Sequence, residues 1–422
     1  MSSIPFTLLP DNASVEPDGS LAIAGVRVDD LASDFGTPLF LYDEDHLRAR
    51  ARAAVAGFPN GAVYASKAFL CTAMARLAAE EGMRVDVATG GELYVALHAG
   101  VPADRLVLHG NNKSVAELRM ALDAGVGRIA VDSFEEIDRI ERLVADGASP
   151  PQVFIRVTPG VEAHTHEFVR TGQDDSKFGF TVSSGAASEA INRAQSSRAM
   201  EVRGIHAHIG SQVFRVDSFA ESLEVLASSA AGFEFPEMVI GGGLGVAYVE
   251  GEQAPSIEDW AEVVHGAARR LGITSELWCE PGRAIVASAA ITVYTIGTVK
   301  RLPGIRTYVA VDGGMSDNPR PVLYGSGYET FLPGRVLDDR AEHIRLVGKH
   351  CESGDVLVRD GAIPAGFEVG ELIATPVTGA YGHSMGSNYN KVLRPPVVFV
   401  RDGSARLVVR RETYEDLVRS DV

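Results

Sequence analysis

The sequence predicts an α/β protein in which a TIM-like (β/α)8 barrel over residues 35–285 is joined to an antiparallel β domain. Between residues 62 and 282, eight short apolar and β-branched runs alternate with amphipathic helical stretches, which is the order and size expected of such a barrel. After residue 285 helical periodicity largely stops, and strands alternate with turns. With 422 residues and 45% hydrophobic content, the chain can bury the cores of two domains.

The strands of the barrel are expected in chain order, separated by helical patterns and Gly-rich turns. They are residues 62–66, 84–89, 105–110, 128–133, 152–157, 204–210, 237–243 and 276–282. Intervening stretches such as residues 71–82, 114–125, 134–147 and 256–272 carry apolar residues at helical spacing and end in Gly. A doubly wound open sheet is the alternative that this pattern leaves open.

The β domain is expected to be sandwich-like or barrel-like and to consist of residues 1–34 and 286–422. Its strands are predicted at residues 291–299, 306–314, 342–350, 355–360, 371–377, 397–403 and 405–412. Residues 20–28, SLAIAGVRV, are expected to add an N-terminal strand, so that the barrel would be inserted into the sequence of the β domain.

The charge and the cysteine content exclude several classes of protein. A net charge of -17 and a pI near 5.1 argue against binding to nucleic acid or to an anionic membrane, because a polyanion would be repelled. The first residues lack a basic segment followed by an apolar core, and no run reaches the ~18 apolar residues of a membrane span. Only Cys71, Cys279 and Cys351 are present, without CxxC spacing, which excludes a structural zinc cluster and fits a reducing compartment. We therefore expect a cytoplasmic location.

Polar residues stand at the C-terminal ends of the expected strands, where a barrel of this type carries its active site. They are Lys67, Asp86, His109, Asp132, His208, Gly241, Gly242, Gly243 and Glu280. Asp132 and the following Ser133 are expected mainly to cap the next helix. The others mark the mouth of the barrel as the candidate site.

Lys67 lies in the segment VYASKAFL, directly after an apolar run. A lysine at the end of a buried strand loses hydration, which favours the neutral amine that forms an imine with an aldehyde or ketone. A solvated residue at a strand end is the plain alternative.

The segment VIGGGLGV, residues 239–246, places three consecutive glycines after the seventh strand. Bare backbone amides followed by a helix start would form a phosphate site at the usual position in a barrel. Nucleotide-binding loops fail on spacing, because a Lys-Ser/Thr pair is missing and Val246 stands where the third glycine of GxGxxG would fall. A purely structural tight turn remains open.

The segment CEPGR, residues 279–283, closes the eighth strand and sets Glu280 three residues before Arg283. The two side chains could form a simple ion pair. Alternatively, Glu280 could keep a pyridine nitrogen protonated while Arg283 meets a phosphate or carboxylate oxygen. A protonated ring withdraws electrons strongly, which favours loss of CO2 from a bound amino acid.

Two His-x-His pairs raise the question of a metal site. His164 and His166 fall in an expected loop, and His206 and His208 share one face of the sixth strand. No third ligand of matching spacing is evident, so we expect no metal. A neutral His208 could stack on a planar cofactor, whereas His206 is expected to be a hydrogen-bonded core residue.

Three loops of the β domain carry further candidates. Cys351 lies in the polar segment KHCESGD, where a cysteine can be an inert filler or can donate a proton near neutral pH. Arg320 and Tyr324 lie in residues 312–325, and Tyr381 lies in residues 377–390. By themselves these segments are compatible with ordinary surface loops.

Taken together, the motifs resemble the pyridoxal-phosphate-dependent decarboxylases with an alanine-racemase-like barrel (fold type III), and among them the diaminopimelate decarboxylases. The resemblance runs from about residue 35 to the C-terminus through YASKA, DVATGGEL, HGNNKS, HIGSQ, GGGLG, CEPGRA, VDGGMSDNPRPVLYG, GKHCESGD and TGAY. It implies that Lys67 carries pyridoxal 5'-phosphate as an imine, that His208 lies against the ring and that Glu280 pairs with the ring nitrogen. The other implied cofactor-binding residues are Asp86, Ser211, Gly241, Gly242, Gly243, Gly282, Arg283 and Tyr381.

The same resemblance implies how a substrate would be held. Arg283, Arg320, Tyr324 and Tyr381 would bind it, largely through its carboxylates, and Glu352 would take its amino group. Cys351, delivered by a second subunit, would protonate the carbanion. A homodimer with shared active sites is therefore expected.

The reaction that the resemblance implies is decarboxylation of meso-2,6-diaminopimelate to L-lysine and CO2, the last step of lysine biosynthesis. Arg320 and Glu352 suit the distal amine and carboxylate of that substrate better than they suit lysine, ornithine or arginine. Alternatives are a decarboxylase of ornithine, arginine or D-lysine, a racemase, and a non-catalytic protein that binds the cofactor. His383, where relatives are expected to carry an aromatic residue, departs from the pattern and leaves the packing of its loop open.

Overall fold

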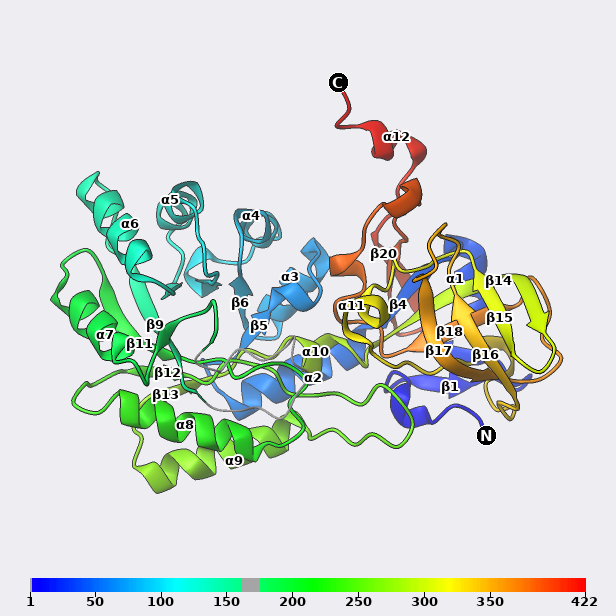
Figure 1. Ribbon diagram of the computed structural model, residues 1–422, viewed down its shortest axis with the longest axis horizontal. Coiled ribbons are helices and arrows are strands. Elements are labelled where there is room, and N and C mark those ends of the chain that lie inside the picture. Colours follow the sequence, from blue (N-terminus) through cyan, green and yellow to red (C-terminus); the bar gives the residue numbers. More distant parts are fainter. Residues whose placement is uncertain (1, 161–174) are drawn as a thin grey trace. The chain divides into compact units, whose positions relative to one another are not determined.

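The computed structural model describes residues 2–160 and 175–422 (Figure 1). The chain divides into two compact units. The first unit consists of Met1–Ala49, Ala247–Gln253 and Ile285–Val422, and the second of Arg50–Val246 and Ala254–Ala284. Residues 35–49 and 247–253 thus lie in the first unit, whereas the sequence places them in the expected barrel.

The second unit is a closed barrel of parallel strands. In chain order these are β5 (Val63–Ala65), β6 (Arg84–Val87), β7 (Leu106–Leu108), β8 (Arg128–Val131), β9 (Gln152–Thr158), β11 (Glu201–His206), β12 (Glu237–Val239) and β13 (Glu276–Trp278). Neighbouring strands pair in this order, and a parallel bridge between Ala62 and Cys279 closes the ring. A short strand, β10 (Phe180–Thr181), also pairs with β9. The predicted eight-stranded barrel is confirmed, and the doubly wound open sheet is excluded.

Helices follow the strands of the barrel, as Figure 1 shows. They are α3 (Thr72–Glu80), α4 (Gly90–His98), α5 (Val115–Ala124), α6 (Phe134–Ala145), α7 (Ala186–Ser196), α8 (Asp217–Ser229), α9 (Ile257–Leu271) and α10 (Arg283–Val286). Their sequences explain several ends: α5 and α9 begin with capping boxes at Ser114 and Ser256, and both end at a left-handed glycine.

Five of the eight barrel strands contribute an apolar side chain to one buried cluster. Val63, Val107, Phe154, Val239 and Trp278 form one fully buried cluster. The rings of Phe154 and Trp278 meet edge to face, 5.3 Å apart. Burial of each of these side chains is worth about 1.5–3 kcal/mol, so the barrel is a packed core.

The strands end earlier than the sequence suggests. The sixth strand stops at His206, the seventh at Val239 and the eighth at Trp278, and glycines with positive φ angles lie in the loops after the sixth and the seventh. Gly210, Gly241 and Gly243 have φ angles of 141°, 71° and 111°. The polar residues thus lie just after the strands, except for Asp86, which lies on β6.

The first unit is built on a sheet with the strand order β17-β16-β15-β14-β4-β19-β20, in which β18 also pairs with β14. Its strands are β4 (Leu39–Asp43), β14 (Ala290–Leu302), β15 (Arg306–Val311), β16 (Glu342–Val347), β17 (Val356–Ile363), β18 (Leu372–Pro376), β19 (Val397–Arg401) and β20 (Ser404–Val409). All seven predicted C-terminal strands are present. The antiparallel prediction is wrong in part, because β15 pairs with β16 and β4 pairs with β19 in parallel.

The prediction that residues 20–28 join this sheet is wrong, because its N-terminal strand is β4. The segment expected to join it forms a separate small sheet of β1 (Ala13–Val15), β2 (Leu21–Ile23) and β3 (Val26–Arg27). Ala24 and Gly25 have positive φ angles and form a turn that folds β3 back on β2. The segment therefore forms two short strands instead of one long strand. The remaining helices are α1 (Val28–Phe35), α2 (Glu44–Gly57), α11 (Arg320–Tyr324) and α12 (Tyr414–Val418).

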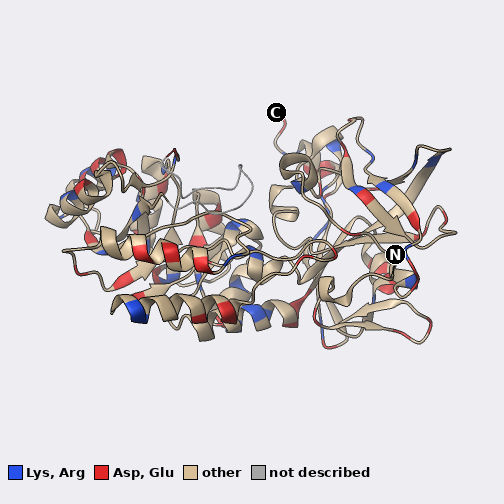
Figure 2. Ribbon diagram, turned by 60° about the horizontal axis from the view of Figure 1, so that its bottom comes forward, with Lys and Arg blue, Asp and Glu red and all other residues tan. Residues whose placement is uncertain are grey.

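Acidic and basic residues are interspersed along the elements of both units (Figure 2). Within residues 2–160 and 175–422, none of the helices is long and apolar enough to cross a bilayer.

Candidate active site

Lys67 lies in a 3-10 turn, Ser66–Ala68, directly after β5. Its side chain is exposed in the chain alone, so our expectation that burial strips this amine of water is wrong. Lys67 is exposed because β5 ends two residues before it and the turn that follows directs its side chain away from the core. Lys67 nevertheless acts electrostatically on Asp86 and His208, which places its amine within range of both.

Asp86 lies on β6 and is buried. Burial raises the pKa of its carboxyl group to about 6, against the opposing effect of His109, while Glu280 raises it further and Lys67 lowers it. A carboxyl group of this kind titrates near neutral pH and can compensate a nearby ammonium group.

His208 is half-buried in the loop after β11, where the backbone amide of Gly242 donates to its Nδ1 at 3.3 Å. Burial and the positive charge of Lys67 lower the pKa of His208 well below its usual value. The imidazole is therefore neutral, and because Nδ1 accepts a hydrogen bond, the proton lies on Nε2. A neutral ring with a fixed tautomer is suited to packing against a planar group.

The three glycines after β12 are required by close backbone contacts. A Cβ atom at Gly242 would lie 1.9 Å from the carbonyl oxygen of Glu280, and one at Gly243 would lie 2.0 Å from that of Gly210. The loop therefore presents bare backbone amides. However, the expected helix start is absent here, since α9 begins only at Ile257. A helix dipole does not contribute, and an anion at this loop would depend on the amides and on neighbouring side chains.

Arg283 begins α10 and donates from Nη2 to the Oγ atom of Ser211 at 2.9 Å. This hydrogen bond joins the loops after β11 and β13, beside the glycines after β12. A Cβ atom at Gly282 would lie 2.9 Å from the carbonyl oxygen of Ala65, so the loop packs directly on the segment that leads to Lys67. These contacts draw the predicted phosphate residues of the barrel together.

Glu280 pairs with two histidines, and within the described residues no ion pair joins it to Arg283, so the simple Glu280–Arg283 ion pair is wrong. Its Oε1 lies 2.9 Å from Nε2 of His109, and its Oε2 lies 2.9 Å from Nε2 of His206. Burial alone would raise the pKa of Glu280, but the two histidines outweigh it and hold that pKa well below its usual value. The carboxylate is therefore ionised.

The two histidines differ in charge. Burial lowers the pKa of His206, whereas Glu280 and Asp86 overcome burial and raise the pKa of His109. The proton of the cluster therefore belongs to His109. The prediction that His206 is a hydrogen-bonded core residue is confirmed. The sequence placed His109 at the mouth of the barrel but indicated no chemical role for it.

His109, His206 and Glu280 also form a set of metal-ligand type, with their ligand atoms within 4.8 Å of one another. In the folded chain, His206 therefore lies beside two possible co-ligands, His109 and Glu280, that the spacing of residues in the sequence does not indicate. In this structure direct contacts between the three side chains use these atoms. His164 and His166 lie outside the described residues.

Asp132 is not a helix cap. Its Oδ1 accepts a hydrogen bond from the amide of Gly179 at 2.6 Å, and its Oδ2 lies 3.5 Å from Nη1 of Arg156. Ser133 caps α6 as predicted, by accepting from the amide of Glu136. Arg156, buried at the end of β9, acts electrostatically on His109 and His208, and the apolar run QVFIRV gave no reason to single it out.

The other predicted residues belong to the first unit. Cys351 and Glu352 are exposed in the loop between β16 and β17, and the amide of Cys351 donates to Oδ1 of Asn390 at 2.9 Å. Arg320 is buried at the start of α11, and Tyr324 is half-buried at its end. Tyr381 is half-buried and has a φ angle of 60°, which is uncommon for a residue with a side chain.

His383 packs as an aromatic residue would. Its ring meets that of Phe40 edge to face at 5.9 Å, and its carbonyl oxygen accepts from Arg394. Burial, assisted by Arg394, lowers the pKa of His383 to about 3, so the ring is neutral. The doubt about this loop is resolved in favour of ordered packing.

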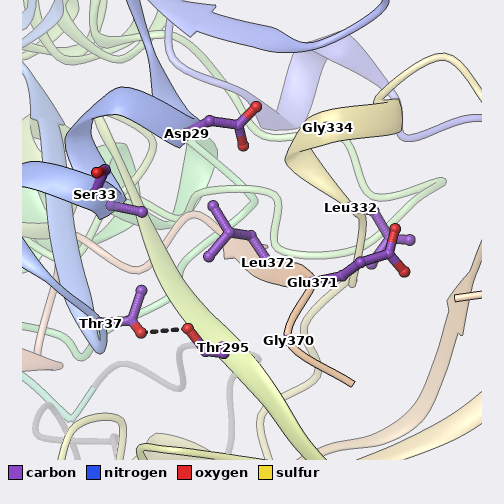
Figure 3. A pocket seen from close by; sticks show the side chains of 10 residues that line it. Asp29, Ser33, Thr37, Thr295, Leu332, Gly334, Gly370, Glu371 and Leu372 are labelled. Atoms are coloured by element: carbon purple, nitrogen blue, oxygen red, sulfur yellow. Dashed lines mark hydrogen bonds between the residues drawn. The ribbon is translucent and has the colours of Figure 1, made fainter. Parts of the chain in front are cut away.

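An open pocket of about 450 Å3 lies elsewhere in the first unit (Figure 3). Asp29, Thr37, Thr295 and Glu371 are among the residues that line it, and the hydroxyl groups of Thr37 and Thr295 are 2.6 Å apart. Its lining includes none of the predicted site residues.

Comparison with known proteins identifies relatives over the whole chain. Residues 44–287 match a family model described as the pyridoxal-binding domain of pyridoxal-dependent decarboxylases. A diaminopimelate decarboxylase from Mycobacterium tuberculosis H37Rv is 46% identical, covering 98% of this chain and 97% of that protein, and one from Bacillus subtilis is 45% identical, covering 96% and 95%. A crystal structure of diaminopimelate decarboxylase from M. jannaschii in complex with L-lysine has a TM-score of 0.90 and 32% identity, covering 98% of both chains.

Proposed function

Because the chain belongs to the pyridoxal-dependent decarboxylases, among the diaminopimelate decarboxylases, we propose that it converts meso-2,6-diaminopimelate to L-lysine and CO2. This reaction is the last step of lysine biosynthesis. The observation that carries the proposal is the similarity of the entire chain, barrel and β unit together, to relatives that bear this one activity in their names.

The residues of the barrel fit pyridoxal 5'-phosphate. The cofactor needs an amine for its aldehyde, an acid for its ring nitrogen and a site for its phosphate. We assign these to Lys67, to the ionised Glu280, and to the loops of Ser211, Gly242 and Arg283. A side chain at Gly242 would collide with the backbone, so the bare amides of this cradle are a requirement of the fold.

When bound, pyridoxal phosphate withdraws electrons from the α-carbon of an amino acid, so that the bond to the carboxylate can break. Glu280 supports this chemistry because an ionised carboxylate favours a protonated ring nitrogen, the stronger electron sink. His109 and His206 keep Glu280 ionised and aimed, since each holds one of its oxygens at 2.9 Å. A racemase, for which a weaker sink is preferable, fits this arrangement less well.

Neutral His208 offers a flat face and no competing charge beside the ring, and Asp86 can compensate the charge of Lys67 before the cofactor binds. Both assignments are proposals that rest on burial and charge. The pKa directions of His208 and Asp86 support them.

For the substrate, we assign Arg283, Arg320, Tyr324 and Tyr381 to binding and Glu352 to the amino group of the distal centre. We assign Cys351 to proton donation in the active site of a second subunit, which requires a homodimer with shared sites. The exposure of Cys351 and Glu352 supports a role toward a partner. All three cysteines are free thiols, which agrees with a cytoplasmic location, also a proposal.

The test is CO2 release by the purified protein supplied with pyridoxal phosphate. Turnover of meso-diaminopimelate should exceed that of ornithine, arginine and D-lysine at equal concentration. Faster turnover of one of those three would assign the chain to the alternative decarboxylases. Absence of CO2 from all four, together with a visible cofactor band that borohydride bleaches, would indicate a non-catalytic binding protein.

A further inference from the structure

Arg320 is a buried cation without an acidic partner. Its side chain is only 5% exposed, yet no carboxylate oxygen within the described part of the chain lies in ion-pair range of its guanidinium. Arg320 donates hydrogen bonds from Nη1 to the hydroxyl of Tyr328 at 2.5 Å and from Nη2 to the hydroxyl of Ser326 at 3.1 Å. Arg340, which is equally buried in the same unit, is paired with Glu250 and Glu329 at 2.8 and 2.5 Å. A buried charge without such compensation favours an anionic ligand.

An aromatic ring covers one face of this guanidinium. The centroid of the Tyr248 ring lies 4.0 Å from Cζ of Arg320, and that of Tyr328 lies 5.3 Å away. The two rings meet edge to face at 5.4 Å. Tyr248 is itself 4% exposed. A cation–π contact at 4.0 Å in a buried site is strong, and together with the two hydrogen bonds it holds the guanidinium in position.

Tyr248 reaches this place on the segment Ala247–Gln253, which follows β12 and belongs to the first unit. The segment is held at several points. The amide of Tyr248 donates to Oε2 of Glu252 at 2.7 Å, and the amide of Glu250 donates to Oε1 of Glu329 at 3.0 Å. Arg340 then joins Glu250 to Glu329. These contacts therefore hold in place the segment that carries the Tyr248 ring.

We infer that Tyr248 is a positioning residue that holds Arg320 for the distal carboxylate of the substrate. A guanidinium binds a carboxylate through the edge of its plane, with two parallel hydrogen bonds, and leaves its faces free for stacking. A ring on one face therefore orients the edge without competing for the ligand. This inference rests on the proposed function, because it takes from there the substrate that Arg320 meets.

Two ligands separate this role from general packing. L-Lysine keeps the distal amine and carboxylate, whereas 1,5-diaminopentane has the same two amines and lacks the carboxylate. Binding of each to the holoenzyme is measured by calorimetry for the wild type, Tyr248→Leu and Tyr248→Phe. Tyr248→Leu removes the aromatic face, and Tyr248→Phe keeps it as a matched control.

Tyr248→Leu should weaken L-lysine binding about 3- to 30-fold and leave diaminopentane binding within about twofold, as expected for the loss of a buried cation–π contact. Tyr248→Phe should behave as the wild type. KM for diaminopimelate should rise by the same factor in Tyr248→Leu with little change in kcat. In an Arg320→Met background, Tyr248→Leu should cause no further loss.

Equal losses for the two ligands, or unchanged binding of L-lysine by Tyr248→Leu, would overturn the inference. These outcomes are read by calorimetry without turnover. Failure of the wild type to release CO2 from diaminopimelate is a separate result, and it would overturn the proposed function instead.

Discussion

At the mouth of the barrel, Nε2 of His109 lies 2.9 Å from Oε1 of Glu280, and both side chains are buried. The pair joins the loop after β7 to the loop after β13, across the ring of strands. The pKa of His109 is raised and that of Glu280 is depressed, so each group favours the charged form of the other. Several expected outcomes follow from this pair and from the residues around it.

His109→Gln should destabilise the protein in a pH-dependent manner. The folded-state pKa of His109 is raised, so its contribution is complete below about pH 6.5 and is lost as pH rises through the raised value. The stability of wild type and variant is measured by thermal melting without cofactor from about pH 6 to 9. Their free energies of unfolding should differ most at the acidic end, by about 2–3 kcal/mol. His343→Gln, at an exposed position on β16, is the control and should show no such trend. A difference in free energy of unfolding that stays constant across this range would show that His109 carries no stabilising positive charge.

Lys67→Ala should abolish the visible absorbance of covalently bound pyridoxal phosphate and its bleaching by borohydride. The reason is that only a primary amine can form the imine, and alanine offers none. Spectra of the purified protein before and after borohydride measure this. Lys113→Ala is no suitable control, because Lys113 forms a buried ion pair with Glu136 at 2.7 Å. Lys349→Ala, in the first unit, serves instead and should retain the band; a band that persists in Lys67→Ala would refute the assignment.

Cys351→Ala should reduce kcat by about 100-fold or more, the usual scale for losing a positioned proton donor, and should keep the cofactor band. Cys71→Ala, in which a thiol outside the proposed site is removed, should remain near wild-type activity. Steady-state CO2 release together with the spectrum decides between proton transfer and packing. Similar kinetics for both variants would reduce Cys351 to a surface residue.

A mixture of Lys67→Ala and Cys351→Ala protein should regain activity if the active site is shared between subunits. Random reassociation would produce mixed dimers in which one of two sites is intact, giving roughly a quarter of wild-type activity. The measurement is CO2 release after joint unfolding and refolding, compared with each variant treated alone. Activity no higher than that of the separate variants would place Lys67 and Cys351 of one chain in the same site.

Gly242→Ala should impair folding or cofactor binding, because its Cβ atom would lie 1.9 Å from the carbonyl oxygen of Glu280. Relief of that overlap requires a backbone shift that costs about 1–3 kcal/mol and moves the amides of the loop. Thermal melting and the dissociation constant of pyridoxal phosphate measure the two effects. Gly334→Ala, where a Cβ atom meets nothing within 4 Å, is the control. Unchanged values for Gly242→Ala would show that the loop has room the structure does not indicate.

Much of the barrel could be predicted because its signals are local. Alternation of apolar runs and helical periodicity within windows of a few residues located all eight strands, and the segments GGGLG and CEPGRA located the loops that follow two of them. The Ser133 cap of α6 could be predicted for the same reason, because it involves residues only three apart in the sequence. The exact strand ends could not be predicted, since they depend on the backbone conformation of the folded loops.

The remaining features depend on contacts between residues distant in the sequence. His109 and Glu280 are separated by most of the barrel, and nothing in HGNNKS indicates an acidic partner. Residues 247–253 follow a barrel strand, so sequence order alone assigned them to the barrel, whereas they belong to the first unit, where the amide of Glu250 donates a hydrogen bond to Glu329. Similarly, β4 pairs with strands about 250 and 350 residues further along the chain.

The position of β4 has a consequence for how the protein can be divided. Since this strand lies between β14 and β19, a gene fragment that starts at residue 285 encodes a sheet with one of its internal strands missing. During synthesis the barrel segment leaves the ribosome long before β19 is made. Until then, the backbone hydrogen-bonding groups of β4 that face β19 have no partner strand. A C-terminal truncation before residue 397 would leave that edge permanently open, which makes aggregation the expected fate of such a nonsense product.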